Sequence, residues 1–306
     1  MKVVDLTGGC IFPEHAEKLK KYAVSYEVYK NVPHDDKEIL KRVGDADILI
    51  SFLMHISAYV IDNAPNLKLV SLGTTGFDDA DLYAATKKDV KVCYVPGYAT
   101  NAVAEHTIGL MLNAGRLAFK SMLDLKGGIY DHCRYRGKEL KQKTLGILGF
   151  GKIGKEVAKI AQNGFAMKII TYDVGSSRAD FENILKQSDF ISIHLPLTPQ
   201  TKHIISFKEF NLMKDGVVLV NTARGGIIDE KALIESVRSG KVFAAGLDVL
   251  QDEPMSVKDP VFNYSSICVT PHIAYNSDEA IYNRSLMVTE NIISFINGKP
   301  QNLACL

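Results

Sequence analysis

Residues 144–161 read Thr-Leu-Gly-Ile-Leu-Gly-Phe-Gly-Lys-Ile-Gly-Lys-Glu-Val-Ala-Lys-Ile-Ala. An apolar run of strand type leads into three glycines spaced Gly-x-Gly-x-x-Gly, and a segment of helical periodicity follows. Gly149 permits the tight turn out of the strand, Gly151 lets the backbone approach a pyrophosphate, and Gly154 lets the helix pack on the strand. The new helix, which starts at Lys152–Ile153, offers unpaired N–H groups to the phosphates. This order of strand, glycines and helix predicts a dinucleotide-binding site.

The alternation of short apolar runs and helical segments continues on both sides of this stretch. Several runs are almost continuously apolar, as strands buried on both faces of a sheet are. Alternation of this kind predicts an α/β architecture with mostly parallel sheets and right-handed crossovers. The expected strands are Val3–Leu6, Ile48–Ser51, Leu67–Leu72, Val90–Val95, Thr144–Leu148, Lys168–Tyr172, Phe190–His194, Val217–Asn221, Val242–Gly246 and Ile267–Thr270. The expected helices are Ala16–Val24, Asp78–Lys88, Lys152–Gln162, Phe207–Met213 and Glu230–Ser239.

Two longer helical segments indicate how the chain is divided. Asn101–Arg116 follows a loop, with Asn101 as the expected N-cap, and Asp278–Gly298 follows the last strand. The final helix is expected to return to the first α/β unit. We therefore expect two domains, one made of residues 1–98 together with 276–306 and the other of residues 99–275.

A carboxylate follows the strand after the glycine turn. Asp173 lies 24 residues beyond Gly149, where an acidic side chain accepts hydrogen bonds from both adenosine ribose hydroxyls and repels a 2′-phosphate. The sequence therefore predicts NAD rather than NADP, with an ordinary acidic loop residue as the alternative. Arg178, a few residues downstream, is a cation that could weaken this discrimination. A kinase-type phosphate loop is not supported, because no Gly-x-x-x-x-Gly-Lys-Ser/Thr pattern occurs.

The composition of the 306-residue chain sets further limits. Lys and Arg number 36 against 35 Asp and Glu, a difference of +1, which argues against a broad nucleic-acid surface or a polybasic membrane patch. The chain start lacks the pattern of a secretory signal, and no window approaches about 18 uncharged apolar residues, so we expect no membrane span. The five cysteines are scattered without a Cys-x-x-Cys pair, which favours buried or incidental thiols in a reducing cytoplasm over disulfides or a metal site.

Polar side chains follow three later strands at the points where those strands end. Arg224 follows one strand, Asp248 and Glu253 follow the next, and His272 follows the last. In an open α/β sheet ligands bind at this edge, and the planar fork of an arginine suits a carboxylate. Taken alone, each has an ordinary alternative: a surface arginine capping a turn, solvated loop carboxylates and a structural histidine. We expect the other seven histidines, His106 among them, to be structural.

Together these motifs resemble the D-isomer-specific 2-hydroxyacid dehydrogenase family, and the resemblance covers essentially the whole chain. Because several motifs occur in the family's order, the resemblance is much more specific than the glycine turn alone. It implies two doubly wound parallel-sheet domains, a Rossmann cofactor domain inserted in a flavodoxin-like substrate domain, with a site in the cleft between them. The stretches that carry it are Ser71–Asp81, Pro96–His106, Leu145–Gly154, His194–Thr198, Leu212–Asp229, Gly246–Pro254 and Thr270–Ala274.

The resemblance implies NAD(H)-dependent interconversion of a small D-2-hydroxy acid and its 2-keto acid. His272 would be the acid/base, Glu253 would pair with it and favour its imidazolium form, and Arg224 would bind the substrate. The implied cofactor contacts are Gly149, Gly151, Lys152, Ile153, Gly154, Asp173, His194, Pro196, Thr222, Ala223 and Asp248, the last accepting from the nicotinamide carboxamide. The implied substrate contacts are Thr75, Gly76, Tyr98, Asn101 and Arg224.

Departures from the family pattern bear on the substrate. Tyr275 follows the histidine motif where many members have a small residue, so a bulky ring is expected to narrow the pocket. The loop Ser51–Ser57 lacks the arginine that phosphoglycerate-specific members often place there. The lack of this arginine, and of the C-terminal regulatory extension that many of those members carry, favours a small, unphosphorylated 2-keto acid. Pro96–Ala102 resembles the D-lactate dehydrogenase and the hydroxypyruvate/glyoxylate reductase versions of that loop, which leaves the choice between them open.

Family members are usually homodimers joined through the cofactor domain, so the resemblance also implies a homodimer. Residues 116–143 are the candidate arm, although Lys120–Lys143 is polar without a clear strand and has a long surface loop as its alternative. Two other functions stay open: a non-enzymatic, NAD-sensing corepressor-like protein, and a phosphite or formate dehydrogenase of the same superfamily. Formate enzymes typically carry glutamine where Glu253 stands, which disfavours them.

Overall fold

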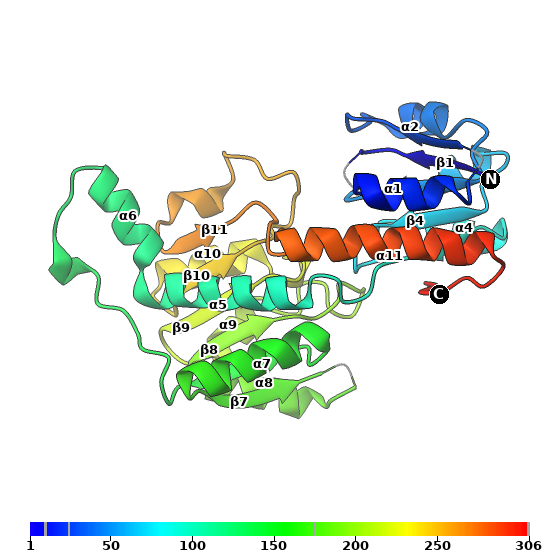
Figure 1. Cartoon of the computed structure of the whole chain (residues 1–306). Helices are drawn as coiled ribbons and strands as arrows, with labels where there is room; N and C mark the ends of the chain where they lie inside the picture. The colour runs from blue at the N-terminus through cyan, green and yellow to red at the C-terminus, as the bar shows by residue number, and fades with distance from the viewer. Residues whose placement is uncertain (9–10, 24, 174, 305–306) are drawn as a thin grey trace. The chain divides into compact units, whose positions relative to one another are not determined.

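The structure is a computed structural model that describes residues 1–8, 11–23, 25–173 and 175–304. Contacts between residues divide the chain into two compact units (Figure 1). Unit 1 comprises Met1–Ala99 and Asn276–Leu306, and unit 2 comprises Thr100–Tyr275. Unit 2 is thus an insertion between the two segments of unit 1.

Unit 1 contains a five-stranded sheet in which every neighbouring pair is parallel. The strand order, β2-β1-β3-β4-β5, is that of flavodoxin. The central strands β3 and β4 are buried at every residue, which explains their nearly continuous apolar runs. The strands are β1 Lys2–Asp5, β2 Ser25–Val28, β3 Ile48–Ser51, β4 Leu69–Leu72 and β5 Lys91–Cys93. The helices are α1 Pro13–Lys20, α2 Asp36–Val43, α3 Ala58–Asn63, α4 Leu82–Lys87 and α11 Asp278–Ile296.

Unit 2 contains a six-stranded sheet, also parallel at every pair, in the order β11-β10-β9-β8-β6-β7. Strand order reverses at β6, which has β7 on one side and β8 on the other, and ligands of open α/β sheets bind at such a point. The strands are β6 Thr144–Leu148, β7 Lys168–Tyr172, β8 Phe190–Ile193, β9 Val217–Asn221, β10 Val242–Leu247 and β11 Ile267–Val269. The helices are α5 Thr100–Arg116, α6 Ala118–Lys126, α7 Lys152–Phe165, α8 Arg178–Gln187, α9 Phe207–Leu212 and α10 Glu230–Arg238, with 3-10 turns η1 His132–Arg134, η2 Gly225–Ile227 and η3 Pro260–Asn263.

Two apolar clusters hold the helices of unit 2 on its sheet. Met111 and Val157 belong to the cluster of α5 and α7, which lie beside one another (Figure 1), and Phe181 and Phe210 belong to that of α8 and α9. A Cβ on Gly246 of β10 would lie 2.9 Å from the Leu110 side chain, so glycine lets α5 sit directly on the strand. The predicted architecture of two parallel-sheet α/β domains is confirmed.

Several elements differ from the sequence prediction. Residues 118–126 form α6, so the surface-loop alternative is wrong for the first part of the segment after Lys120. Thr100 already belongs to α5, which places Asn101 inside the first turn instead of at the N-cap. The prediction also missed β2, α2, α3 and α8. Since β2 is an edge strand with mostly exposed residues, it lacks the apolar run that marks a buried strand.

Within the described part of the chain, no helix combines the length and the apolar character needed to cross a membrane. The longest helix, α11, carries Asp278, Glu279, Arg284 and Glu290.

Candidate active site

The glycine turn after β6 has the geometry that a pyrophosphate needs. Gly149 has a φ of +98°, and a Cβ there would lie 2.5 Å from the carbonyl of His194. A Cβ on Gly154 would lie 2.2 Å from the Gly149 carbonyl oxygen, so glycine is required for α7 to begin this close to β6. A Cβ on Gly151 would meet nothing within 4 Å, and as the N-cap this glycine puts no side chain over the helix N-terminus. Open space beside the first N–H groups of α7, including Lys152–Ile153, fits the diphosphate of a dinucleotide.

The turn after β8 lies against these glycines. His194 donates its backbone N–H to the Leu148 carbonyl, and its Nε2 lies 2.8 Å from the Ser192 hydroxyl. Burial lowers the pKa of His194 to about 4, so its imidazole is neutral at neutral pH. Pro196 follows at the surface, where its carbonyl accepts from the Thr201 hydroxyl at 2.6 Å. The structure thus brings His194 to the glycine turn and leaves Pro196 exposed.

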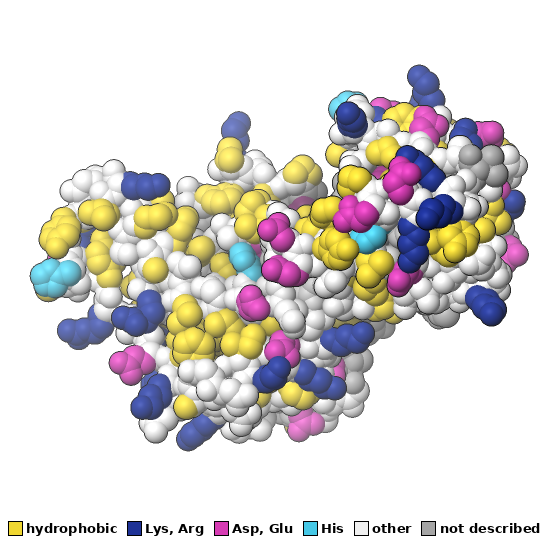
Figure 2. Space-filling model, in the orientation of Figure 1, with side chains coloured by type: hydrophobic (Ala, Val, Ile, Leu, Met, Phe, Trp, Pro, Cys, Tyr) yellow, Lys and Arg dark blue, Asp and Glu magenta, His cyan; other side chains and the backbone are white. Residues whose placement is uncertain are grey.

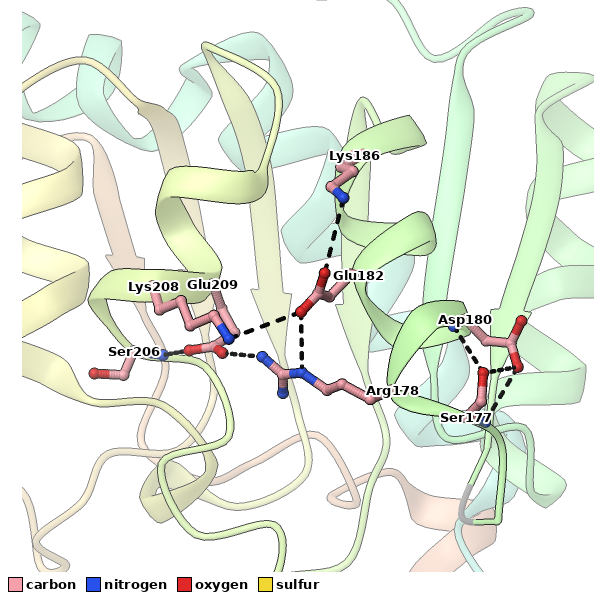
Figure 3. A network of polar contacts seen from close by, with 8 residues as sticks. All are labelled: Ser177, Arg178, Asp180, Glu182, Lys186, Ser206, Lys208 and Glu209. Atoms are coloured by element: carbon pink, nitrogen blue, oxygen red, sulfur yellow. Dashed lines mark hydrogen bonds and ion pairs between the residues drawn. The ribbon is translucent and has the colours of Figure 1, made fainter.

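Asp173 follows β7, the neighbour of β6, and is exposed. The nearby cation, Arg178, is paired with two other carboxylates (Figure 3): its Nη2 lies 2.5 Å from Glu209 Oε1, and its Nε lies 3.3 Å from Glu182 Oε1. The guanidinium also lies 5.0 Å from the centroid of the Phe181 ring. Since the Glu209 side chain is only 9% exposed, this ion pair holds the arginine against α9. The sequence pattern, which placed the arginine near Asp173, gave no sign of this pairing.

Three neighbouring strands end together at the candidate site. Arg224 follows β9, Asp248 and Glu253 follow β10, and His272 follows β11. The sheet order is β11-β10-β9 and all pairs are parallel, so these carboxyl ends lie side by side at one edge. The structure therefore places the four residues at the same edge of unit 2.

His272 and Glu253 form a close pair. Nδ1 of His272 lies 2.6 Å from Glu253 Oε2, with the two side chains 27% and 34% exposed. Because a carboxylate only accepts, Nδ1 of His272 carries the proton in this pair. Glu253 Oε1 also accepts from the Leu250 backbone N–H at 3.4 Å. The Tyr275 ring stands edge-on to the imidazole, with centroids 6.2 Å apart.

The backbone around Arg224 is held by its neighbours. The buried Asn221 side chain donates to the Arg224 carbonyl at 2.9 Å and accepts from the Ala223 N–H at 3.0 Å. A Cβ on Gly225 would lie 1.9 Å from the Leu250 carbonyl carbon, so this turn packs directly on the backbone that leads to the glutamate. Arg224 Nη1 donates to the Ala223 carbonyl at 2.9 Å.

Asp248 is a buried hydrogen-bond acceptor between two strand ends. Its Oδ1 accepts from the Thr270 hydroxyl at 2.5 Å and from the Ile273 N–H at 2.9 Å, and its Oδ2 accepts from the Ala274 N–H at 2.8 Å. Burial raises the pKa of Asp248, but the hydrogen bonds, that from His106 first, outweigh burial and lower the pKa overall. The carboxylate is therefore ionised at neutral pH.

Sequence reasoning missed His106, which it classed as structural. Its Nε2 lies 3.0 Å from Thr270 Oγ1 and 3.5 Å from Asp248 Oδ1. The contact joins residues 164 positions apart, so no local spacing could have revealed it.

The remaining predicted substrate contacts lie in loops of unit 1, apart from one residue of α5. Thr75 and Gly76 follow β4, and the Thr75 hydroxyl donates to the Val95 carbonyl at 3.3 Å. Tyr98 follows β5 and is buried. Asn101 is exposed in the first turn of α5 in unit 2.

A cation of α11 lies against the loop after β3 in unit 1. The Arg284 guanidinium lies 3.9 Å from the centroid of the Phe52 ring, and Arg284 is only 3% exposed. The preference for an unphosphorylated substrate, inferred from the lack of an arginine within Ser51–Ser57, stays a prediction.

The chain is similar to known proteins in sequence and in fold. Residues 108–274 match the family described as "D-isomer specific 2-hydroxyacid dehydrogenase, NAD binding domain". The chain is 41% identical over 265 residues to the hydroxypyruvate reductase of Thermotoga maritima, covering 83% of this chain and 86% of that protein. The chain belongs to the D-isomer-specific 2-hydroxyacid dehydrogenase family. It is also 34% identical over 311 residues to the glyoxylate reductase of Thermococcus litoralis, covering 95% of this chain and 93% of that protein.

A solved structure supports the same membership. The D-lactate dehydrogenase of Aquifex aeolicus, complexed with NAD and lactic acid, is similar with a TM-score of 0.83 and 28% sequence identity, covering 98% of this chain and 96% of that one. This D-2-hydroxyacid dehydrogenase is accordingly an oxidoreductase with NAD as its cofactor. The predicted family, enzyme class and cofactor are confirmed.

Proposed function

We propose that this D-2-hydroxyacid dehydrogenase interconverts a small D-2-hydroxy acid and its 2-keto acid in an NAD(H)-dependent reaction. The observation that carries the proposal is the His272–Glu253 pair, 2.6 Å apart, at the sheet edge where Arg224 also stands. The similarity to a hydroxypyruvate reductase and to a glyoxylate reductase supports a short keto acid.

The proton and the substrate are handled by three side chains. NAD(H), when bound, supplies the hydride chemistry. In reduction, His272 donates the Nε2 proton to the carbonyl oxygen, while its Nδ1–H goes on donating to Glu253, whose negative charge stabilises the imidazolium form. Arg224 binds the substrate carboxylate and carbonyl oxygen through its planar guanidinium. In oxidation the same Nε2 accepts the hydroxyl proton.

The remaining cofactor and substrate contacts are part of the proposal. Asp248 Oδ2, which accepts one bond from Ala274, is the oxygen we assign to the nicotinamide carboxamide. The adenosine ribose is assigned to Asp173. The pyrophosphate and the walls of the cofactor site are assigned to Gly149, Gly151, Lys152, Ile153, Gly154, His194, Pro196, Thr222 and Ala223. The further substrate contacts are Thr75, Gly76, Tyr98 and Asn101.

The decisive assay is NADH oxidation with a panel of keto acids. Pyruvate, hydroxypyruvate, glyoxylate and 2-ketoisocaproate test chain length, and 3-phosphohydroxypyruvate tests the charge that Arg284 places beside Phe52. The Tyr275 ring beside His272 favours the short acids. No turnover with any of these acids would overturn the proposal.

Asp173→Ala is expected to change cofactor preference. The carboxylate's hydrogen bonds to the ribose are charge-assisted, so their loss should weaken NADH binding by about tenfold. Loss of its charge should strengthen NADPH binding, and adding Glu209→Gln, which removes one of the two carboxylates paired with Arg178, should strengthen it further. Fluorescence titration gives both dissociation constants, and Asp215→Ala, at an exposed aspartate of the same unit, is the control. An unchanged ratio of NADPH to NADH affinity would contradict the assignment.

Glu253→Gln is expected to lower kcat for reduction by about tenfold at neutral pH. The hydrogen bond from His272 Nδ1 then goes to an uncharged amide oxygen instead of a carboxylate and is weaker. The neutral amide still contacts the imidazole, but it stabilises the transferring proton less than a carboxylate does. Steady-state measurement of kcat checks this, with Glu235→Gln on α10 as the control. A kcat within about twofold of the wild type would count against the role assigned to the Glu253 carboxylate.

We also propose that the enzyme is a homodimer joined through unit 2. α6 has no buried residue, and Met122, Leu123 and Leu125 on it are 43%, 41% and 57% exposed. The helix and the loop after it project from the sheet of unit 2 (Figure 1), and hydrophobic side chains gather on this arm (Figure 2). Exposed apolar surface of this kind is stabilised by a second copy. Sedimentation equilibrium should give a dimer, and Leu123→Glu with Leu125→Glu should give a monomer.

A further inference from the structure

Helix α5 contacts both loops that carry the proposed catalytic side chains. We define these as the His272 loop, Thr270–Ala274, and the Arg224 loop, Thr222–Gly225. Two consecutive residues of α5 make the contacts: His106 Nε2 lies 3.0 Å from the threonine that opens the first loop, and Thr107 Oγ1 lies 2.8 Å from the threonine that opens the second. All of these residues belong to unit 2.

The direction of the hydrogen bonds at His106 follows from counting protons. The Thr270 hydroxyl donates to Asp248 Oδ1 at 2.5 Å. A hydroxyl has a single proton, so toward His106 the same oxygen must accept. His106 therefore carries a proton on Nε2, and a donor chain runs from the imidazole through the hydroxyl to the carboxylate.

Asp248, the last acceptor in this series of hydrogen bonds, holds the backbone around His272. The Asp248 carboxylate accepts from the N–H groups of Ile273 and Ala274, and the Asp248 carbonyl accepts from the His272 N–H at 2.8 Å. Three successive amides are thus bound to one residue. They hold His272 at a φ of +52°, a left-handed conformation that is costly for a residue with a Cβ.

The second contact works on the Arg224 loop in the same way. The buried Thr107 hydroxyl donates to the Val103 carbonyl of its own helix at 2.7 Å. Its proton is thereby used, so in the contact with Thr222 the hydroxyl of Thr222 is the donor. α5 is itself fixed on β10 by the close approach at Gly246.

We propose that His106 is a positioning residue for the proton transfer. Through Thr270 and Asp248 it holds the His272 loop in its left-handed turn, while Thr107 holds the Arg224 loop from the same helix. The role in turnover rests on the proposed function; the role in holding the loop does not. Displacement of a reacting group by about 1 Å costs up to about 10²-fold in rate, which sets the size of the expected effect.

Two substitutions separate the hydrogen bond from the shape of the ring. His106→Phe keeps the ring and removes the donor, whereas His106→Gln puts an amide N–H in its place. We expect kcat for keto acid reduction to fall about 10- to 100-fold in His106→Phe. In His106→Gln, kcat should stay much closer to the wild-type value. Without any ligand, the amides of Ile273 and Ala274 should exchange hydrogen about tenfold faster in the phenylalanine variant only. An exposed histidine of unit 1, changed as His34→Phe, should alter neither measurement.

A third substitution, Thr270→Val, removes the hydroxyl that links His106 to Asp248, and it tests the proposal if His106→Phe fails to fold. Because both substitutions break the same series of hydrogen bonds, the double variant should lose no more kcat than either single variant. Additive losses, exchange rates equal to those of the wild type, or a kcat within about twofold of the wild type in both single variants would overturn the proposal. If the wild type reduces no keto acid, the proposed function fails, and the exchange rates still decide whether His106 holds the loop.

Discussion

His272→Ala should lower kcat for 2-keto acid reduction by about 10²- to 10⁴-fold, the range by which a positioned acid accelerates proton transfer. Alanine removes the imidazole whose Nδ1 is bonded to Glu253 and whose Nε2 we assign to the substrate oxygen. The loop should keep its path, because its backbone amides and not the imidazole bind it to Asp248.

This expectation separates chemistry from cofactor binding. The dissociation constant of NADH, measured by fluorescence titration, should stay within about threefold of the wild type, since the imidazole acts on the substrate and not on the dinucleotide. His34→Ala, at an exposed histidine of unit 1, should leave kcat unchanged. A loss of NADH affinity as large as the loss of kcat would show that His272 holds the cofactor, and the assigned role would be wrong.

The parts of the fold that the sequence could predict are those with a local cause. β6 and β9 have the bounds that their apolar runs predict, because strands buried on both faces need apolar residues at every position. The requirement for Gly154 is equally local, since its Cβ would clash with the carbonyl of Gly149 in the same turn. Gly149 was found from the motif, although its Cβ would clash with the distant His194 after β8. Because the carboxyl ends of parallel strands meet at one edge of a sheet, the predicted parallel sheet also places Arg224 and His272 at the same edge.

What the sequence could not predict depends on contacts between distant residues. His106 looks like any helix histidine until Thr270 and Asp248 meet it from two other strand ends. Arg178 looks like a free cation near the cofactor until Glu209 of α9 pairs with it. α6 was missed because none of its residues is fully buried and Phe119 packs on the core only in part, so the helix shows no clear apolar stripe toward its own unit.

Arg224→Ala should lower kcat/KM for the keto acid by about 10²- to 10³-fold. Removing one partner of a hydrogen-bonded charge pair costs about 2–5 kcal/mol, and the guanidinium is the group we assign to both the carboxylate and the carbonyl oxygen of the substrate. Arg224→Lys should recover only part of the loss, because an ammonium is a point charge without the planar fork. Steady-state kinetics of the two variants with the best keto acid of the panel give both values.

The arginine can be removed without moving the loop that carries it. Asn221 holds the backbone from both sides of the residue, and Gly225 packs on the Leu250 carbonyl, so neither contact uses the guanidinium. NADH affinity should therefore persist, and added guanidinium ion should restore part of the activity of the alanine variant but not of the wild type. Arg238→Ala, at an exposed arginine of α10, is the matched control. A kcat/KM within about threefold of the wild type for Arg224→Ala would mean that the substrate carboxylate is bound elsewhere, because no variant that loses a direct charged contact could be that active.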